Sequence, residues 1–185
     1  MPRLAGIHRL FVACHPPADA AAAMLAHAAA LPLPEGRWTP PAQVHLTLHF
    51  IGDVAERDLD AVIESVERSA SGIPACRLDT DRLISLPERG PARLLAAAPS
   101  GDTPASLFEI RRRLVRRLAK SPRNDDDQHF TPHLTLLRFA APTPTPRVDT
   151  PMPPIPWRVG RVSLMRSVLR PGGASHAEIA GFALG

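Results

Sequence analysis

The sequence predicts an α+β fold built from two similar halves, and two observations support this prediction. First, a His-x-Thr pattern in "QVHLTLHF" returns in the second half of the chain as "PHLTLLRF". Second, the segment before each pattern runs in the same order of apolar strand, turn, helix and polar loop. Because the chain has 185 residues, we expect a single domain of two lobes, with one His-x-Thr pattern in each repeat, roughly 8–86 and 92–185.

The first repeat is expected to contain three strands and two helices. The apolar run 9–14 is closed by "HPPAD", and the Ala-rich segment 18–31 then has helical spacing. The first His-x-Thr strand follows the loop "RWTPPAQ". A helix of mixed charge is expected over 54–69, and the apolar strand 76–86 ends in the hairpin turn "PERGP".

The second repeat departs from the first in one place. A short apolar strand begins at Arg93, a helix is expected over 105–120, and the second His-x-Thr strand follows the loop "SPRNDDDQHFTP". Where the first repeat has its second helix, residues 140–156 are rich in proline and are expected to form a semi-rigid connection. A hairpin is then expected from 157–169 through the turn "RPGGA".

Composition indicates a globular protein that could accept an anionic partner. The net charge of +4 and the pI of about 10.3 favour a polyanion, although a general bias toward arginine would produce the same values. Cys14 and Cys76 are too few for a disulfide framework or a zinc knuckle, so we expect two buried thiols in a reducing compartment. Neither a signal peptide nor a membrane span is recognisable, so a cytoplasmic protein is expected.

Each His-x-Thr pattern places an imidazole and a hydroxyl on one face of a strand, because residues two apart point the same way. His45 and Thr47 would thus oppose an apolar face that includes Phe50, and His133 and Thr135 repeat the arrangement. One imidazole could accept a proton and the other donate one, as cleavage of a phosphodiester requires, while the hydroxyls bind its non-bridging oxygens. This reasoning leaves open which histidine is the acid and which is the base.

The stretches "RWTPPAQVHLTLHFIGDV" and "FTPHLTLLRF" resemble the two signatures of the 2H phosphoesterase superfamily, and within it the bacterial RNA 2',3'-cyclic phosphodiesterases (2'-5' RNA ligases). "RLFVAC" and "SLMRSVLRPGG" are similar as well, so the resemblance covers nearly the whole chain. It implies a bilobal, pseudo-twofold fold with two antiparallel sheets lining a central cleft and helices outside, and it implies no metal and no cofactor. The implied substrates are RNA 3' ends or small 2',3'-cyclic nucleotides, hydrolysed to 2'-phosphates, and reversible 2'-5' ligation at the same site stays open. A monomer is expected.

The resemblance also implies roles for five residues by their place in the motifs. His45 would donate a proton to the leaving 3' oxygen, and His133 would activate water. Thr47 and Thr135 would hold the phosphate, and Arg138, three residues after the second threonine, would help to bind it.

The remaining histidines and aromatic residues are expected to have structural or surface roles. His176 lies near a place where relatives often carry a tyrosine, and His49 is expected to border the cleft. Trp38 and Phe130 are expected to pack in the core, although either could stack on a base. Four further histidines and one acidic segment are expected at the surface or in the core: His8, His15, His27, His129 and Asn124–Asp127.

Three alternatives stay open at this point. A metal hydrolase using several of the histidines is disfavoured because no His-x-x-x-His or similar ligand spacing occurs. A non-catalytic RNA-binding protein would use the basic face of the helix 105–120, which is otherwise a solvated surface. A 2H phosphoesterase acting on another cyclic nucleotide is the third alternative.

Overall fold

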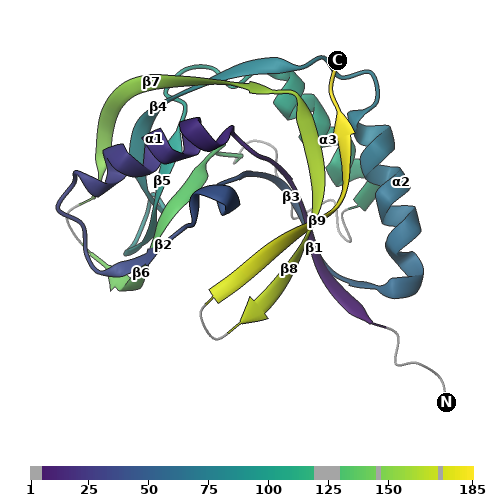
Figure 1. Ribbon diagram of the computed structural model, residues 1–185, viewed down its shortest axis with the longest axis horizontal. Helices are drawn as coiled ribbons and strands as arrows, with labels where there is room; N and C mark the ends of the chain where they lie inside the picture. Colours follow the sequence, from purple (N-terminus) through teal and green to yellow (C-terminus); the bar gives the residue numbers. More distant parts are fainter. Residues whose placement is uncertain (1–5, 119–129, 145–146, 171–172) are drawn as a thin grey trace.

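The computed structural model describes residues 6–118, 130–144, 147–170 and 173–185 (Figure 1). Within these ranges the chain forms an antiparallel sheet with helices packed on it, which confirms the predicted α+β class. The strands are β1 (Ile7–Cys14), β2 (Gly36–Trp38), β3 (Leu46–Ala55), β4 (Cys76–Leu86), β5 (Ala92–Ala98), β6 (Leu134–Thr143), β7 (Asp149–Val159), β8 (Arg161–Arg170) and β9 (Gly173–Ala183). The helices are α1 (Ala18–Ala29), α2 (Leu59–Ala70) and α3 (Ala105–Leu118), with 3-10 turns at Pro41–Gln43 and Glu56–Asp58.

The strands that carry the two His-x-Thr patterns lie side by side in the middle of the sheet. The strand order is β7-β4-β5-β6-β3-β1-β8-β9, and β2 adds to β6. β3 and β6 share a single residue pair, Leu46 opposite Leu134, and both side chains are fully buried. The resemblance implied two antiparallel sheets. The structure joins them into one, because the two His-x-Thr strands pair with each other where they begin.

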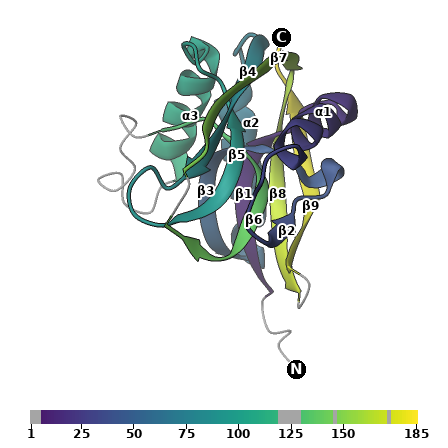
Figure 2. The same cartoon turned by 90° about the vertical axis from the view of Figure 1, so that its left-hand side faces the viewer.

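The helices cover the sheet on different sides. α1 packs against β6 and β7, whereas α3 packs against β3, and α2 lies between α3 and the strands β8 and β9. Figure 2 shows α1 and α3 at opposite sides of the molecule. Strands from the two predicted repeats also mix in the sheet, since β4 pairs with β5 and β7 while β8 pairs with β1.

Two expected elements differ in the structure. The helix expected over 54–69 begins only at Leu59, because Val54 and Ala55 continue β3 as partners of β1. The proline-rich segment 140–156 is largely strand and not a connection, since β6 runs to Thr143 and β7 begins at Asp149. β7 tolerates its prolines because it is an edge strand that pairs only with β4.

The remaining elements follow the prediction closely. The hairpins β4–β5 and β8–β9 form as expected. The helix expected over 18–31 ends at Ala29, and α3 is described as far as Leu118. The two cysteines are free thiols; Cys14 is buried, which raises its pKa, and Cys76 is half-buried. Among the helices described here, none has the length and apolar character needed to cross a membrane.

Candidate active site

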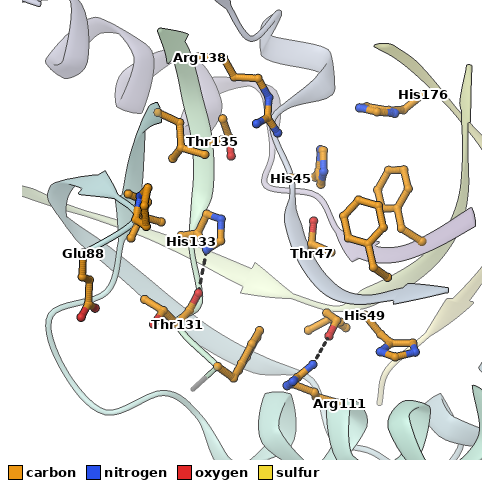
Figure 3. A pocket seen from close by; sticks show the side chains of 17 residues that line it. His45, Thr47, His49, Glu88, Arg111, Thr131, His133, Thr135, Arg138 and His176 are labelled. Carbon is orange, nitrogen blue, oxygen red and sulfur yellow. Dashed lines mark hydrogen bonds between the residues drawn. The ribbon is translucent and has the colours of Figure 1, made fainter. Parts of the chain in front are cut away.

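A cleft of about 1060 Å³ lies between β3 and β6, and all five predicted site residues line it. His45 directly precedes β3 and Thr47 is its second residue, and His133 and Thr135 have the same positions relative to β6. Figure 3 shows these two pairs facing each other, with Arg138 of β6 beside them. The chain thus brings together two segments that are far apart in the sequence.

The two histidines are held in the same way. The Nδ1 atom of His45 lies 2.7 Å from the carbonyl oxygen of Gln43, and that of His133 lies 2.8 Å from the carbonyl oxygen of Thr131. A carbonyl oxygen can only accept a hydrogen bond, so Nδ1 carries the proton in both rings. Each neutral imidazole therefore keeps the lone pair on Nε2, and each protonated imidazole would carry a second proton there.

Burial disfavours the protonated, charged form of both imidazoles. Desolvation lowers the pKa of His45 to about 4, although the hydrogen bond to the carbonyl of Gln43 opposes this shift, and the charges of His176, His15 and Arg138 lower the pKa further. Desolvation also lowers the pKa of His133, with a smaller contribution from Arg138. Both rings are consequently neutral near pH 7, and an anion in the cleft would favour their protonated forms.

Two irregularities in β3 change which residues face the cleft. The register between β1 and β3 shifts at two places, so that Phe11 lies opposite Phe50. These β-bulges reverse the alternation of side chains along the strand. The prediction that Phe50 belongs to the apolar inner face is therefore wrong: 61% of its surface is exposed, and its ring stacks on Phe11 at 5.6 Å between ring centroids. Phe11 in turn lies 5.1 Å from the ring of His45.

A third and a fourth histidine lie near His45. The ring of His176, on β9, is 5.3 Å from that of His45 in an edge-to-face arrangement, and it lines the cleft. The ring of His15, which follows β1, is 5.8 Å from that of His45. Desolvation lowers the pKa of both additional histidines. His176 thus lies in the cleft and His15 lies beside it, while the expected structural or surface role of each stays a prediction.

The floor of the cleft contains a buried arginine from α3. The Nη1 atom of Arg111 donates a hydrogen bond of 3.2 Å to the carbonyl oxygen of Leu48, and its guanidinium lies 4.8 Å from the ring of Phe130 (Figure 3). The next two residues of the helix, Arg112 and Arg113, instead bind Glu109 on the outer face. The basic run of this helix is therefore divided between the cleft and a charged surface.

The other candidate residues have mixed positions. Phe130 and His49 line the cleft as well, and His49 is buried. Trp38 was expected in the core but is 40% exposed, because β2 is a short outer strand. His8 pairs with Glu56, away from the cleft. His129 and Asn124–Asp127 lie outside the described residues.

Sequence reasoning missed Phe11, Phe50 and Arg111 as cleft residues, and it missed His15 as a neighbour of the His45 ring. The bulges that turn Phe50 outward leave no mark in the residue pattern, and the burial of Arg111 depends on how α3 docks on β3. Among the described residues, no group of three or more histidine, cysteine or acidic side chains is arranged to hold a metal ion.

The chain is similar in sequence to known proteins. The model of the 2'-5' RNA ligase superfamily matches residues 16–170. A protein of Thermus thermophilus named RNA 2',3'-cyclic phosphodiesterase is 31% identical over 180 residues, which cover 95% of this chain and 90% of that protein. A protein of the same name from Aquifex aeolicus is 31% identical over 108 residues, covering 56% of this chain and 55% of that one.

Solved structures show the same fold. The structure of TT0787 of Thermus thermophilus has a TM-score of 0.78 at 28% identity, covering 95% of this chain and 97% of that one. The structure of E. coli LigT complexed with 3'-AMP has a TM-score of 0.76 at 24% identity, covering 96% of this chain and 98% of that one. With a family match over most of its length and a relative of 31% identity across 95% of it, the chain belongs to the 2'-5' RNA ligase superfamily, the 2H phosphoesterases.

Proposed function

We propose that this protein is a metal-independent phosphodiesterase that hydrolyses 2',3'-cyclic phosphate ends of RNA to 2'-phosphates. The observation that carries the proposal is the matched pair of imidazoles, each with Nδ1 bound to a backbone carbonyl and each beside a threonine in one cleft. The names of the two curated relatives support the same substrate class. Because one chain supplies both motifs, the proposed site needs no second copy, and we expect a monomer.

In the proposed reaction, the cyclic phosphate binds between the two histidines. Nε2 of His133 accepts a proton from a water molecule as the water oxygen forms a bond to phosphorus. The bond between phosphorus and the 3' oxygen breaks on the opposite side, and protonated His45 gives that oxygen its Nε2 proton. The products are a 3' hydroxyl and a 2'-phosphate, and one proton has moved from one side of the phosphate to the other.

Thr47, Thr135 and Arg138 would stabilise the charge on the phosphate during this step. The hydroxyls can donate hydrogen bonds to the non-bridging oxygens, and the guanidinium supplies positive charge. The negative phosphate also raises the pKa of a neighbouring imidazole, which offsets the desolvation that keeps His45 neutral before the substrate binds. Substrate binding thus prepares the acid that the reaction needs. The same residues would serve 2'-5' ligation if a 5' hydroxyl took the place of water.

The test is the identity of the product from an RNA oligonucleotide that ends in a 2',3'-cyclic phosphate. The protein is treated with EDTA beforehand, and His45→Ala and His133→Ala are measured alongside His27→Ala, a histidine of α1 that does not line the cleft. We expect a 2'-phosphate from the wild type and from His27→Ala, and loss of turnover in the other two variants. Activity that EDTA abolishes and zinc restores would favour the metal hydrolase instead.

Three further outcomes would contradict the proposal. A wild-type protein that binds the RNA without converting it would support the non-catalytic RNA-binding alternative. Turnover of another cyclic nucleotide, with none of the RNA end, would keep the chemistry but replace the substrate. A 3'-phosphate product would mean that the bond cleaved is not the one given in the mechanism above.

A further inference from the structure

A side pocket of about 230 Å³ adjoins the cleft, and its lining includes basic side chains that have no role in the proposed reaction. It shares His45, Thr135 and Arg138 with the cleft and extends to Arg37 and Trp38 on β2. Acidic side chains are absent from the described residues that line it, whereas its arginines are Arg9, Arg37 and Arg138. The chemistry of this lining suits an anion.

The two arginines on β2 and β6 are placed against each other. Arg37 and Arg138 are directly opposite each other in the antiparallel pairing of these strands, so two positive side chains start from neighbouring positions and an anion would bind favourably between them. The guanidinium of Arg37 also lies over the backbone of Gly173, where a β-carbon would overlap it. Desolvation lowers the pKa of Arg138 and of His176, and the charge of Arg37 lowers both further. Arg37 is therefore close to the two residues at which the side pocket meets the cleft.

Trp38 offers an aromatic face in the same pocket. It is 40% exposed, on a strand whose three residues are all exposed. A large aromatic ring that stays partly exposed beside basic side chains is the combination by which proteins bind single-stranded nucleic acids, with bases stacked on the ring and phosphates on the cations.

The substrate in the proposed function has a second phosphate that nothing in the catalytic pair would hold. A nucleoside 2',3'-cyclic phosphate has one phosphate, which would lie between His45 and His133. An RNA end has in addition the phosphate that links its last two nucleotides. The cleft, at about 1060 Å³, has room for the terminal nucleotide. The side pocket joins it at His45, Thr135 and Arg138, beside the place proposed for the cyclic phosphate, where the preceding nucleotide would continue.

We propose that the side pocket is a subsite for the penultimate nucleotide of an RNA strand, with the linking phosphate between Arg37 and Arg138 and the penultimate base on Trp38. This inference rests on the proposed function and deepens it. It makes the enzyme selective for polynucleotide ends over free cyclic nucleotides, and it assigns that selectivity to β2, which carries neither His-x-Thr motif.

The test compares two substrates that share the same terminal base: a dinucleotide with a 2',3'-cyclic phosphate end, and the corresponding nucleoside 2',3'-cyclic phosphate. The wild type should prefer the dinucleotide in kcat/KM by about tenfold or more, the scale of one stacking contact with one phosphate contact. Trp38→Ala and Arg37→Gln should remove most of this preference while leaving turnover of the mononucleotide within about twofold, which also shows that the variants are folded.

A matched control is available at the edge of the sheet formed by β7 and β4. Arg158 lies directly opposite Arg77 in the pairing of β7 with β4, so Arg158→Gln relieves a similar pair of like charges without touching the cleft. It should leave the preference unchanged. A dinucleotide whose linking phosphate is replaced by an uncharged methylphosphonate should be insensitive to Arg37→Gln but still sensitive to Trp38→Ala.

The outcomes separate this inference from the proposed function. If the wild type hydrolyses both substrates equally well, or if the two variants lose activity on both substrates alike, the subsite is refuted and the phosphodiesterase proposal stands. If the wild type hydrolyses neither substrate, the proposed function itself fails.

Discussion

The assignment of His45 as the acid and His133 as the base can be tested with a leaving group that needs no proton. In a 2',3'-cyclic phosphate whose bridging 3' oxygen is replaced by sulfur, the leaving group departs as a thiolate. A general acid is then dispensable, whereas water must still be deprotonated. Substitution of the acid should therefore harm hydrolysis of the oxygen substrate much more than hydrolysis of the sulfur substrate.

The expected magnitude follows from the way the two rings are held. Hydrogen bonds of 2.7 and 2.8 Å from Nδ1 to backbone carbonyls fix both imidazoles, so each contributes as a positioned group. A positioned acid or base accelerates a reaction by about 10²- to 10⁴-fold. We expect His45→Ala to lose about this factor with the oxygen substrate and less than about tenfold with sulfur, while His133→Ala loses it with both.

The assay is kcat/KM for both substrates, with the wild type and His27→Ala as references. Rescue of His133→Ala by sulfur, with no rescue of His45→Ala, would reverse the assignment. If sulfur rescues neither variant, neither histidine acts as the acid, and the two-histidine mechanism is refuted. The double variant should lose little more than the worse single variant, because groups that act on one step are not additive.

Three further predictions concern pH, the basic charge of the cleft and the junction of the sheet. Burial lowers the pKa of both His45 and His133 below 6.5. The protonated acid is lost as pH rises and the neutral base is lost as pH falls, so kcat/KM should peak below pH 6.5. A peak above pH 7.5 would contradict this. Arg138→Gln should lower kcat by about 10²- to 10³-fold. Because the charge of Arg138 lowers the pKa of His45 and His133, the variant should also raise both pKa values in an NMR titration, and unchanged pKa values would refute this prediction. Leu46 belongs to the fully buried pair of β3 and β6, so Leu46→Ala should lower the free energy of unfolding, measured in urea, by about 2 to 5 kcal/mol. Ile7 is exposed, so Ile7→Ala should change it by less than about 0.5 kcal/mol. Equal effects would contradict the packing argument.

The sequence predicted that two histidines and two threonines share a site because their signal is local, whereas Arg138 was implied only by the resemblance. A strand period of two fixes which face a histidine and a threonine share, and this requires no knowledge of the rest of the fold. The repetition of His45 and Thr47 as His133 and Thr135 then indicated that the two strands meet. The structure places all four in one cleft, while their catalytic roles stay predictions.

Tertiary structure determined what the sequence could not. Two bulges in β3 turn Phe50 outward, although strict alternation assigned it to the inner face. The prolines of 140–156 indicated a connection, but the edge position of β7 removes the need for the backbone donors that proline lacks. His176 reaches the cleft only because β9 folds back along β8, a hairpin whose register no local pattern specifies.

The near symmetry of the two motifs raises the question of how identical pairs could perform opposite tasks. The local geometry does not distinguish them, since both rings use the same hydrogen bond to the carbonyl two residues before. The difference lies in residues outside the motifs: His176 and His15 act on the pKa of His45, whereas Arg138 is the charged neighbour common to both rings. The two motifs therefore become unequal through the β8–β9 hairpin and the end of β1, and any division of labour between the histidines must come from that asymmetric environment and from the side on which the leaving oxygen binds.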